Sequence, residues 1–234
     1  MNSLLNDPIC NNLARVRERI ARAEQAAGVP PGTVKLVGVT KTRPVQEIET
    51  AISAGLKDIG ENRLQEALAK LPGLRLPVTR HFIGHLQRNK VRDCLGLFDM
   101  IQSVDSVRLA EAIDERAGNQ GIRARVLIEV NTSGEESKFG VDEDSLKELV
   151  EFVAGSGNIE LLGLMTVGPL TGDRARVAAS FRALKKLFEK YASLKARNIR
   201  MEILSMGMSA DFEIAIAEGA NMIRVGTAIF GPRI

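Results

Sequence analysis

The sequence predicts an α/β fold, a single (β/α)8 TIM barrel spanning residues 1–234, with an additional helix at its N-terminus. Eight short apolar runs alternate with amphipathic segments, and such near-continuous runs are expected of parallel strands covered on both faces. Eight repeats in 234 residues also fit a barrel of ordinary size. The alternative is a doubly wound open sheet. It is disfavoured because eight repeats exceed its usual size and no G-x-G-x-x-G follows the first run.

The additional helix is predicted over residues 8–27. Asp7 is placed to cap it, and Pro8 suits its first position. Apolar residues at helical spacing then lead to Gly28, which is typical of a helix end. The chain ends three residues after Gly231, so no helix is expected after the last strand. We expect the N-terminal helix to fill that gap, beside the first and last strands.

The first four repeats follow a break at Pro30-Pro31-Gly32. Their apolar runs predict strands, and apolar residues at three- and four-residue spacing between them predict helices. The strands are VKLVGVT (34–40), DIGEN (58–62), HFIGHL (81–86) and MIQSV (100–104). The helices are 44–55, a segment carrying Leu64, Leu68 and Leu71, a helix within NKVRDCLGLF (89–98) that turns into a loop, and a segment capped by Asp105 or Ser106 with Leu109, Ala112 and Ile113 on its apolar side.

The second half of the chain continues the same alternation. Its predicted strands are RVLIEVN (125–131), IELLGLMTVG (159–168), ILSMG (203–207) and NMIRVGTAIFG (221–231). Three helices separate them: one with Leu146, Leu149, Val150 and Val153 on its apolar side, a long one with Val177, Phe181, Leu184, Leu187 and Phe188, and one over 209–218.

Composition narrows the class of function. The net charge is only +3, with 26% charged residues of mixed sign, which argues against nucleic-acid or membrane binding and suits an anionic metabolite. Cys10 and Cys94 match no metal-ligand spacing and are too few for a disulfide scaffold. The N-terminus lacks a signal-peptide pattern, and no segment has the length of a membrane span. We therefore expect a cytoplasmic protein with inert thiols and no metal site.

Polar residues cluster at the predicted carboxyl ends of the strands, where barrel enzymes place their active sites. Such residues follow seven of the eight strands: Lys41, Asn62, His85-Leu86-Gln87, Asn131-Thr132, Met165-Thr166, Ser205 to Ser209, and Arg224 to Thr227. We expect them to line one cavity.

Strands seven and eight end in segments that suit a phosphate group. SMGMSAD (205–211) places small residues and hydroxyls just before a predicted helix, and VGTAIFG (225–231) places Gly226 and Thr227 at the end of the neighbouring strand. A phosphate group needs exposed backbone N–H groups, hydroxyl donors and preferably a helix N-terminus. The loops after these strands are the usual phosphate site of barrel enzymes. Either segment alone is also typical of an ordinary turn, so their adjacency is the stronger observation. Asp211 and Glu213 would repel an anion if they pointed inward.

Lys41 gains a chemical role from this setting. A closed barrel brings strand one beside strand eight, so Lys41 and Arg224 can face the same cavity near the phosphate site. A buried amine beside a second cation is favoured in its neutral, nucleophilic form. Lysine, phosphate cradle and cationic partner together suggest pyridoxal 5′-phosphate held as a Schiff base. A phosphate-binding barrel enzyme that uses Lys41 on a sugar-phosphate carbonyl is the alternative without this cofactor.

Seven motifs resemble one known family at consistent spacing along nearly the whole chain. They are VGVTKTRP, IGENRLQEA, HFIGHLQRNK, VNTSGEESKFG, GLMTVGP, SMGMSADFEIAI and IRVGTAIFG. They look like the YggS/PROSC family of pyridoxal phosphate-binding proteins, which has the barrel fold of the alanine racemase N-terminal domain and acts in intracellular pyridoxal phosphate homeostasis. One departure is Arg80, which stands where the family is expected to have an aromatic residue.

The resemblance implies roles for individual residues. Lys41 would form the Schiff base, and Arg224 would face the pyridine nitrogen. The remaining implied cofactor contacts are Ser209, Gly226 and Thr227 for the phosphate, Asn62 and Met165 near the ring, and Ser205. Lys138 is a candidate second amine, although a solvated loop cation is the simpler interpretation.

Two hypotheses for the function remain within that resemblance. Arg224 beside the pyridine nitrogen favours its unprotonated form and weakens the ring as an electron sink. Racemisation needs two acid–base groups, and alanine racemase takes one of them, a tyrosine, from a second domain of its partner. Here Tyr191 falls on the apolar stripe of a helix, where packing is expected. A carrier is therefore preferred to a low-activity racemase, and we expect a monomer with transient recipient enzymes as partners.

His81 and His85 are the remaining candidates for a base. Four residues along a strand separate them by roughly 13 Å, which excludes a shared zinc ion. His85, at the expected strand end, could approach the cofactor, whereas a buried structural histidine is the default interpretation.

Overall fold

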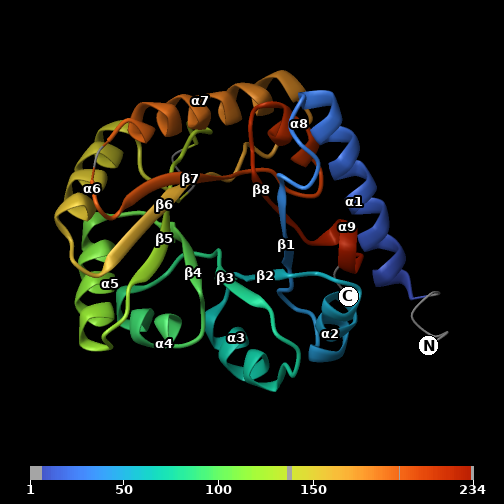
Figure 1. The fold of residues 1–234 in the computed structure, drawn as a ribbon, viewed down its shortest axis with the longest axis horizontal. Coiled ribbons are helices and arrows are strands. Elements are labelled where there is room, and N and C mark those ends of the chain that lie inside the picture. Colours follow the sequence, from blue (N-terminus) through green and yellow to red (C-terminus); the bar gives the residue numbers. More distant parts are fainter. Residues whose placement is uncertain (1–6, 136–138, 195, 233–234) are drawn as a thin grey trace.

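The computed structural model describes residues 7–135, 139–194 and 196–232. Eight parallel strands form a closed barrel in the order β1 to β8, and β8 pairs with β1 (Figure 1). This confirms the predicted (β/α)8 barrel. The strands are β1 (Lys35–Val39), β2 (Asp58–Glu61), β3 (Thr79–Phe82), β4 (Met100–Val104), β5 (Ala124–Glu129), β6 (Ile159–Met165), β7 (Ile199–Ser205) and β8 (Met222–Val225).

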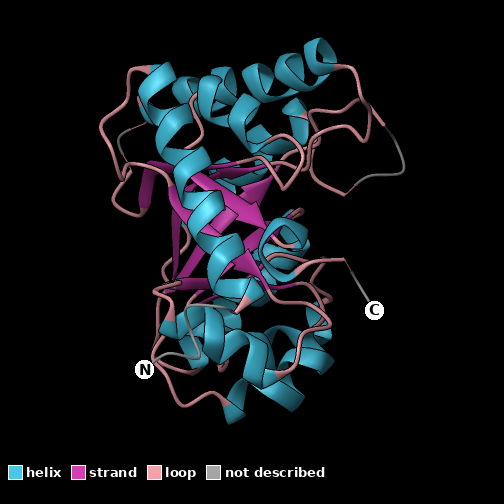
Figure 2. Ribbon diagram, turned by 90° about the vertical axis from the view of Figure 1, so that its right-hand side faces the viewer, coloured by secondary structure: helices cyan, strands magenta, loops and turns pink. Residues whose placement is uncertain are grey.

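Helices surround the strands on the outside, so the barrel wall is covered on its outer face (Figure 2). Most of the apolar core lies between wall and helices, where the side chains predicted for the apolar faces of α6 and α7 pack. The helices are α1 (Pro8–Ala27), α2 (Val45–Ser53), α3 (Leu64–Lys70), α4 (Val91–Leu95), α5 (Val107–Asn119), α6 (Glu143–Gly155), α7 (Arg174–Ala192), α8 (Phe212–Ala217) and α9 (Thr227–Phe230), with 3-10 turns η2 (Leu71–Gly73) and η3 (Arg88–Lys90).

The first helix lies where the sequence predicts it. Asp7 Oδ1 accepts a hydrogen bond from the Ile9 N–H at 2.7 Å, and Gly28 ends the helix in the left-handed conformation. Along its length α1 packs against α2, α8 and α9, next to β1 and β8 (Figure 1). Asn12 donates to the Ile229 carbonyl of α9 at 3.0 Å. A short helix, α9, does follow β8, contrary to the expectation that none would, and α1 packs on it beside the first and last strands (Figure 1).

Several element boundaries differ from the prediction, including the start of β7, which is Ile199 and not 203. Strand β3 begins at Thr79 and ends at Phe82, because it pairs with β2 from Asp58 onward. Arg80 lies within this pairing, so the departure from the family pattern leaves the strand intact. After β8 the chain turns at Gly226 directly into α9, whereas the predicted strand continued to 231. Helix α8 begins at Phe212, three residues later than expected.

The three leucines predicted for the α3 segment are not all buried. Leu64 and Leu71 are buried, but Leu68 is 41% exposed and Ala67 takes the buried position instead.

Both thiols have a raised pKa because burial disfavours the thiolate, which agrees with the inert role expected of Cys10 and Cys94. None of the described helices combines the length and apolarity needed to cross a membrane.

The interior of the barrel is more polar than its outer wall. Glu129, Met165 and Ser205 are successive partners in register across β5, β6 and β7, so their side chains share the inner face. A small apolar cluster, Met100, Leu127, Leu162 and Met165, occupies part of this interior. Buried Asp58, His81, Gln102, Ser205 and Arg224 fill the rest.

Candidate functional site

Lys41 follows β1 at the carboxyl end of the barrel. Val37 is in register with Asp58 and Arg224, whose side chains point into the interior. Alternation along β1 then places Val39 on the inner side and Thr40 on the outer side. Lys41 has the inner parity and is half-buried. Strand β1 therefore directs Lys41 toward the mouth of the barrel.

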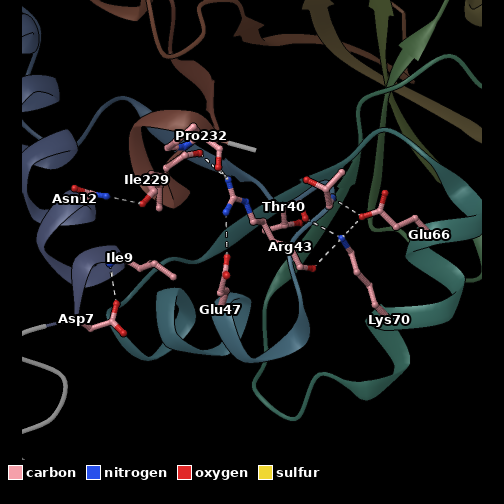
Figure 3. A network of polar contacts seen from close by, with 12 residues as sticks. Asp7, Ile9, Asn12, Thr40, Arg43, Glu47, Glu66, Lys70, Ile229 and Pro232 are labelled. Carbon is pink, nitrogen blue, oxygen red and sulfur yellow. Dashed lines mark hydrogen bonds and ion pairs between the residues drawn. The ribbon is translucent and has the colours of Figure 1, made fainter. Parts of the chain in front are cut away.

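The loop that carries Lys41 is held from both sides (Figure 3). Lys70 of α3 donates to the carbonyl oxygens of Thr40, at 2.8 Å, and Arg43, at 3.4 Å. The Thr42 N–H donates to Glu66 Oε1 at 2.5 Å and keeps a β-branched residue at φ 64°. The surroundings therefore fix this backbone conformation, since an isolated threonine rarely adopts it.

Arg43 fastens the other end of the same loop. Its Nη2 donates to the carbonyl oxygens of Gly231 and Pro232, at 2.6 and 2.7 Å, and its Nη1 lies 3.5 Å from Glu47 (Figure 3). The segment after β8 is thereby tied to the segment after β1.

Glu61 lies under this loop, between the barrel wall and α3. It is fully buried, accepts a hydrogen bond from the Thr40 hydroxyl, and pairs with Lys70 at 2.8 Å. Burial raises the pKa of its carboxyl, opposed by Lys70 and Thr40. Its second oxygen, Oε2, has no partner among the described residues.

Arg224 spans the interior from β8. Its Nη1 donates to Ser205 Oγ at 2.6 Å and its Nη2 to the Thr166 carbonyl at 2.7 Å. Burial lowers the pKa of the guanidinium to about 10, opposed by Glu129 and Asp211, so it stays cationic at neutral pH. Arg224 and Ser205 therefore meet directly inside the barrel.

The two loops predicted to hold a phosphate group meet at one atom. Ser209 Oγ accepts hydrogen bonds from the N–H groups of Gly226 and Ala228, both at 3.3 Å. A Cβ on Gly226 would lie 3.3 Å from Val39 Cβ. The cluster therefore packs against the end of β1, two residues before Lys41 in the sequence. Thr227 is the first residue of α9 rather than a strand residue. These N–H groups already hold one oxygen, which is the arrangement that an anion requires.

Gly207 shapes the first of these loops. It has φ 94°, and a Cβ there would lie 2.9 Å from the Phe212 backbone. Its carbonyl accepts from the Arg224 N–H at 3.0 Å. The loop after β7 therefore folds against the start of α8, as only glycine allows.

The repulsion of an anion that Asp211 and Glu213 could cause at this cluster is reduced in two different ways. Asp211 Oδ1 accepts from the Met208 N–H at 2.5 Å, and burial raises the pKa of this carboxyl. Glu213 points outward and pairs with Arg19 of α1 at 2.6 Å.

Asn62 and Met165 lie on the inner side of their strands. Asn62 continues the inner parity of Asp58 and Gly60, and its Oδ1 is buried with no partner among the described residues. Gly84 packs on it, since a Cβ there would lie 2.2 Å from the Asn62 carbonyl oxygen. Met165 is fully buried in the inner apolar cluster.

Some predicted candidates lie away from this cluster. Thr132 contacts Thr166 Oγ1 at 3.0 Å and Ser180 of α7 at 2.8 Å, on the outer side of the wall. His85 is not a buried structural residue, because its side chain is 42% exposed and stacks on Phe139. It falls beyond β3, which ends at Phe82 and leaves His81 as the interior histidine. Lys138 lies outside the described residues.

Glu129 is a candidate that the sequence prediction missed. It ends β5 on the inner face and is 7% exposed. Burial raises its pKa to about 7, with Asp105 adding to the rise and Arg224 and His85 opposing it. The polar ending of the run RVLIEVN was the available signal, but the prediction assigned it to Asn131 and Thr132.

Clefts on the surface do not define the site. One of about 220 Å³ joins Asn62 to His85, Gln87 and Lys90 near the mouth. Another of about 630 Å³ opens at the opposite end, beside Leu56 and Val78, and none of the predicted site residues lines it. Among the described residues no three His, Cys, Asp or Glu side chains are placed to hold a metal ion.

Comparisons with known proteins agree on one family. The model for "Alanine racemase, N-terminal domain" matches residues 11–233. A pyridoxal phosphate homeostasis protein from Aquifex aeolicus is 44% identical over 96% of this chain and 98% of its own length. A protein of unknown function from Bifidobacterium adolescentis has a solved structure with TM-score 0.91 and 43% identity, covering 95% of this chain and 94% of its own. PipY from Synechococcus elongatus, solved with pyridoxal phosphate bound, has TM-score 0.81 and 36% identity, covering 92% of this chain and all of its own.

Proposed function

This chain belongs to the alanine racemase N-terminal domain family and, within it, to the pyridoxal phosphate homeostasis proteins, and from this premise we propose that it binds pyridoxal 5′-phosphate through Lys41. Its function would be to hold and release the cofactor in intracellular pyridoxal phosphate homeostasis. One observation carries the proposal: two backbone N–H groups converge on Ser209 Oγ beside Val39, two residues before the lysine.

The side chains in the barrel mouth fit this cofactor. Ser209, Gly226 and Thr227 would hold its phosphate, and Arg224 would face its ring nitrogen. The buried, unpartnered Asn62 Oδ1 suits a hydroxyl donor on the ring. Met165 and Ser205 would complete the wall. Bound there, pyridoxal phosphate supplies an aldehyde that a lysine amine can bind reversibly.

The residues around the ring favour a carrier over an efficient enzyme. Arg224 remains a cation held between Ser205 and Thr166, so it cannot give the ring nitrogen the proton that would strengthen electron withdrawal. Tyr191 is 6% exposed on α7 and packs in the outer core, which makes it unsuitable as a proton donor at the mouth. We therefore propose reversible binding, in the cytoplasm and as a monomer, with transfer to recipient enzymes.

Glu129 supports a second candidate, a slow amino-acid racemase. Its near-neutral pKa at the barrel mouth would let it hold or release a proton at physiological pH. Exchange of the α-proton of alanine in deuterated solvent, compared between wild type and Glu129→Gln, separates the two functions. A carrier shows no exchange above free cofactor, whereas Glu129-dependent exchange would favour the racemase.

Titration of the purified protein with pyridoxal phosphate tests the proposed function. We expect the visible absorbance of covalently held cofactor to saturate at one per chain. Lys41→Ala should lose this absorbance while the circular dichroism is unchanged, and Lys147→Ala, an exposed lysine on α6, should behave as wild type. Equal absorbance in Lys41→Ala would overturn the assignment.

Thr227→Ala tests the phosphate end separately. Loss of one hydrogen bond to a charged group should weaken cofactor binding by about 1–2 kcal/mol. Unchanged affinity in an equilibrium titration would remove Thr227 from the site.

A further inference from the structure

A continuous chain of buried hydrogen bonds crosses the barrel from Arg224 to its opposite end. Arg224 Nη1 lies 2.6 Å from Ser205 Oγ, which lies 2.7 Å from Gln102 Oε1. Gln102 Nε2 lies 3.0 Å from His81 Nδ1, and His81 Nε2 lies 2.9 Å from Asp58 Oδ1. The chain runs over β8, β7, β4, β3 and β2. All five residues are buried, with at most 6% of their surface exposed.

The direction of every hydrogen bond in this chain is determined by its two ends. Arginine can only donate, so Ser205 Oγ accepts from Arg224 and gives its one proton to Gln102. The amide oxygen of Gln102 is then the acceptor, and its nitrogen donates to His81. His81 must accept at Nδ1 and donate from Nε2 to the Asp58 carboxylate. Only one neutral tautomer of His81 satisfies the whole chain.

Met222 fixes the orientation of the Gln102 amide independently. Its sulfur lies 3.2 Å from Gln102 Nε2 and can only accept. A flipped amide would turn its oxygen toward that sulfur and its nitrogen toward Ser205. The reversed chain would therefore lose a hydrogen bond and bring two acceptors into contact.

The far end of the chain is anchored near solvent. Lys35 Nζ, on a half-exposed side chain, lies 3.9 Å from Asp58 Oδ1, and both residues line a cleft of about 450 Å³ at the amino end of the barrel. The last acceptor of the chain therefore lies beside a cation.

We propose that Gln102, His81 and Asp58 are positioning residues for Arg224, acting through the fixed hydroxyl of Ser205, with His81 held as the Nε2–H tautomer. This rests on the proposed function, in which Arg224 faces the cofactor ring. Because Ser205 Oγ and the Thr166 carbonyl each hold one Nη atom, the guanidinium cannot rotate. The other N–H groups of the Arg224 guanidinium keep a fixed direction as long as a lone pair of Ser205 Oγ accepts the hydrogen bond from Nη1.

Nitrogen-15 NMR of the two histidines in cofactor-free protein tests the tautomer directly. His85→Gln assigns the remaining signal to His81. We expect His81 to carry its proton on Nε2 at neutral pH. A proton on Nδ1 would overturn the proposal, and this measurement needs no core variant to fold.

Gln102→Glu gives a response that a packing role would not. A carboxylate has no hydrogen to donate, so one additional proton must lie between the new carboxyl group and His81 Nδ1, held by either group. Either arrangement should shift the Nδ1 resonance of His81 relative to wild type. An unchanged His81 ring would contradict the chain.

Gln102→Leu tests the effect on Arg224. The separate Nη signals of Arg224, assigned with Arg224→Lys, should merge as the guanidinium begins to rotate, and pyridoxal phosphate should bind about tenfold more weakly. Gln120→Leu, the same change at the exposed end of α5, should alter neither. If the NMR results are as expected but the wild-type protein binds no pyridoxal phosphate, the proposed function is wrong and the hydrogen-bond chain is still supported. If the cofactor binds equally well to Gln102→Leu, the positioning role fails alone.

Discussion

Lys70 of α3 donates to the carbonyl oxygen of Thr40 at 2.8 Å, one residue before the lysine proposed to bind the cofactor (Figure 3). The same ammonium pairs with buried Glu61 and with Glu66, which in turn holds the Thr42 N–H. The loop conformation of Lys41 therefore depends on an ion cluster that lies outside the barrel wall.

Lys70→Met should destabilise the fold by about 3 kcal/mol, because it leaves the Glu61 charge buried without its partner. Urea unfolding measures the loss. Lys147→Met, which breaks an exposed pair with Glu151, should stay within about 1 kcal/mol of wild type. Equal effects of the two variants would show that the cluster does not support the loop.

Glu129 predicts a pH dependence of stability. Its pKa is about 7 in the folded state and 4.5 ordinarily, so between these values the folded protein keeps a proton that the unfolded chain has released. This contribution is fully present below pH 4.5 and is lost as pH rises through about 7. Relative to Glu129→Gln, the free energy of unfolding of cofactor-free wild type should fall by a few kcal/mol at most over this window.

Denaturant titrations of both proteins at several pH values give this difference. A wild type that gains stability relative to Glu129→Gln as pH rises would mean that Glu129 is well solvated or firmly paired.

Tyr191→Phe should stabilise the protein by about 1 kcal/mol. The phenolic oxygen is buried with no partner among the described residues, so its removal ends a desolvation cost. Tyr191→Leu, which also removes ring volume, should lose stability. A marked loss in Tyr191→Phe during thermal unfolding would reveal a hydrogen bond or a functional role for this hydroxyl.

Ser209→Ala should weaken pyridoxal phosphate binding about tenfold, since the hydroxyl that joins the two loops is lost. Ser193→Ala, at the exposed end of α7, is the matched control. Equilibrium titration of both variants decides the matter, and equal affinities would separate Ser209 from the phosphate.

The sequence predicts most of the fold because local signals agree with it. Asp7, Pro8 and Gly28 mark both ends of α1, and the apolar run before Lys41 marks β1. Boundaries were wrong where pairing decides them: β3 starts at Thr79 because β2 lies beside it, and α9 begins where Gly226 turns the chain.

The chain of hydrogen bonds inside the barrel could not be predicted from local sequence signals. Gln102 and Ser205 meet across the barrel although 103 positions separate them. Both lie inside predicted strands, and their inward direction depends on strand register. Glu129 was missed for the same reason, since alternation alone does not show which face of β5 points inward.

Borohydride reduction of the protein with pyridoxal phosphate, followed by peptide mass mapping, shows which residue carries the cofactor. We predict one phosphopyridoxyl group per chain, on the peptide that contains Lys41, and none on that peptide in Lys41→Ala. An adduct spread over exposed lysines, or its absence, would contradict the claim that this barrel holds its cofactor through Lys41.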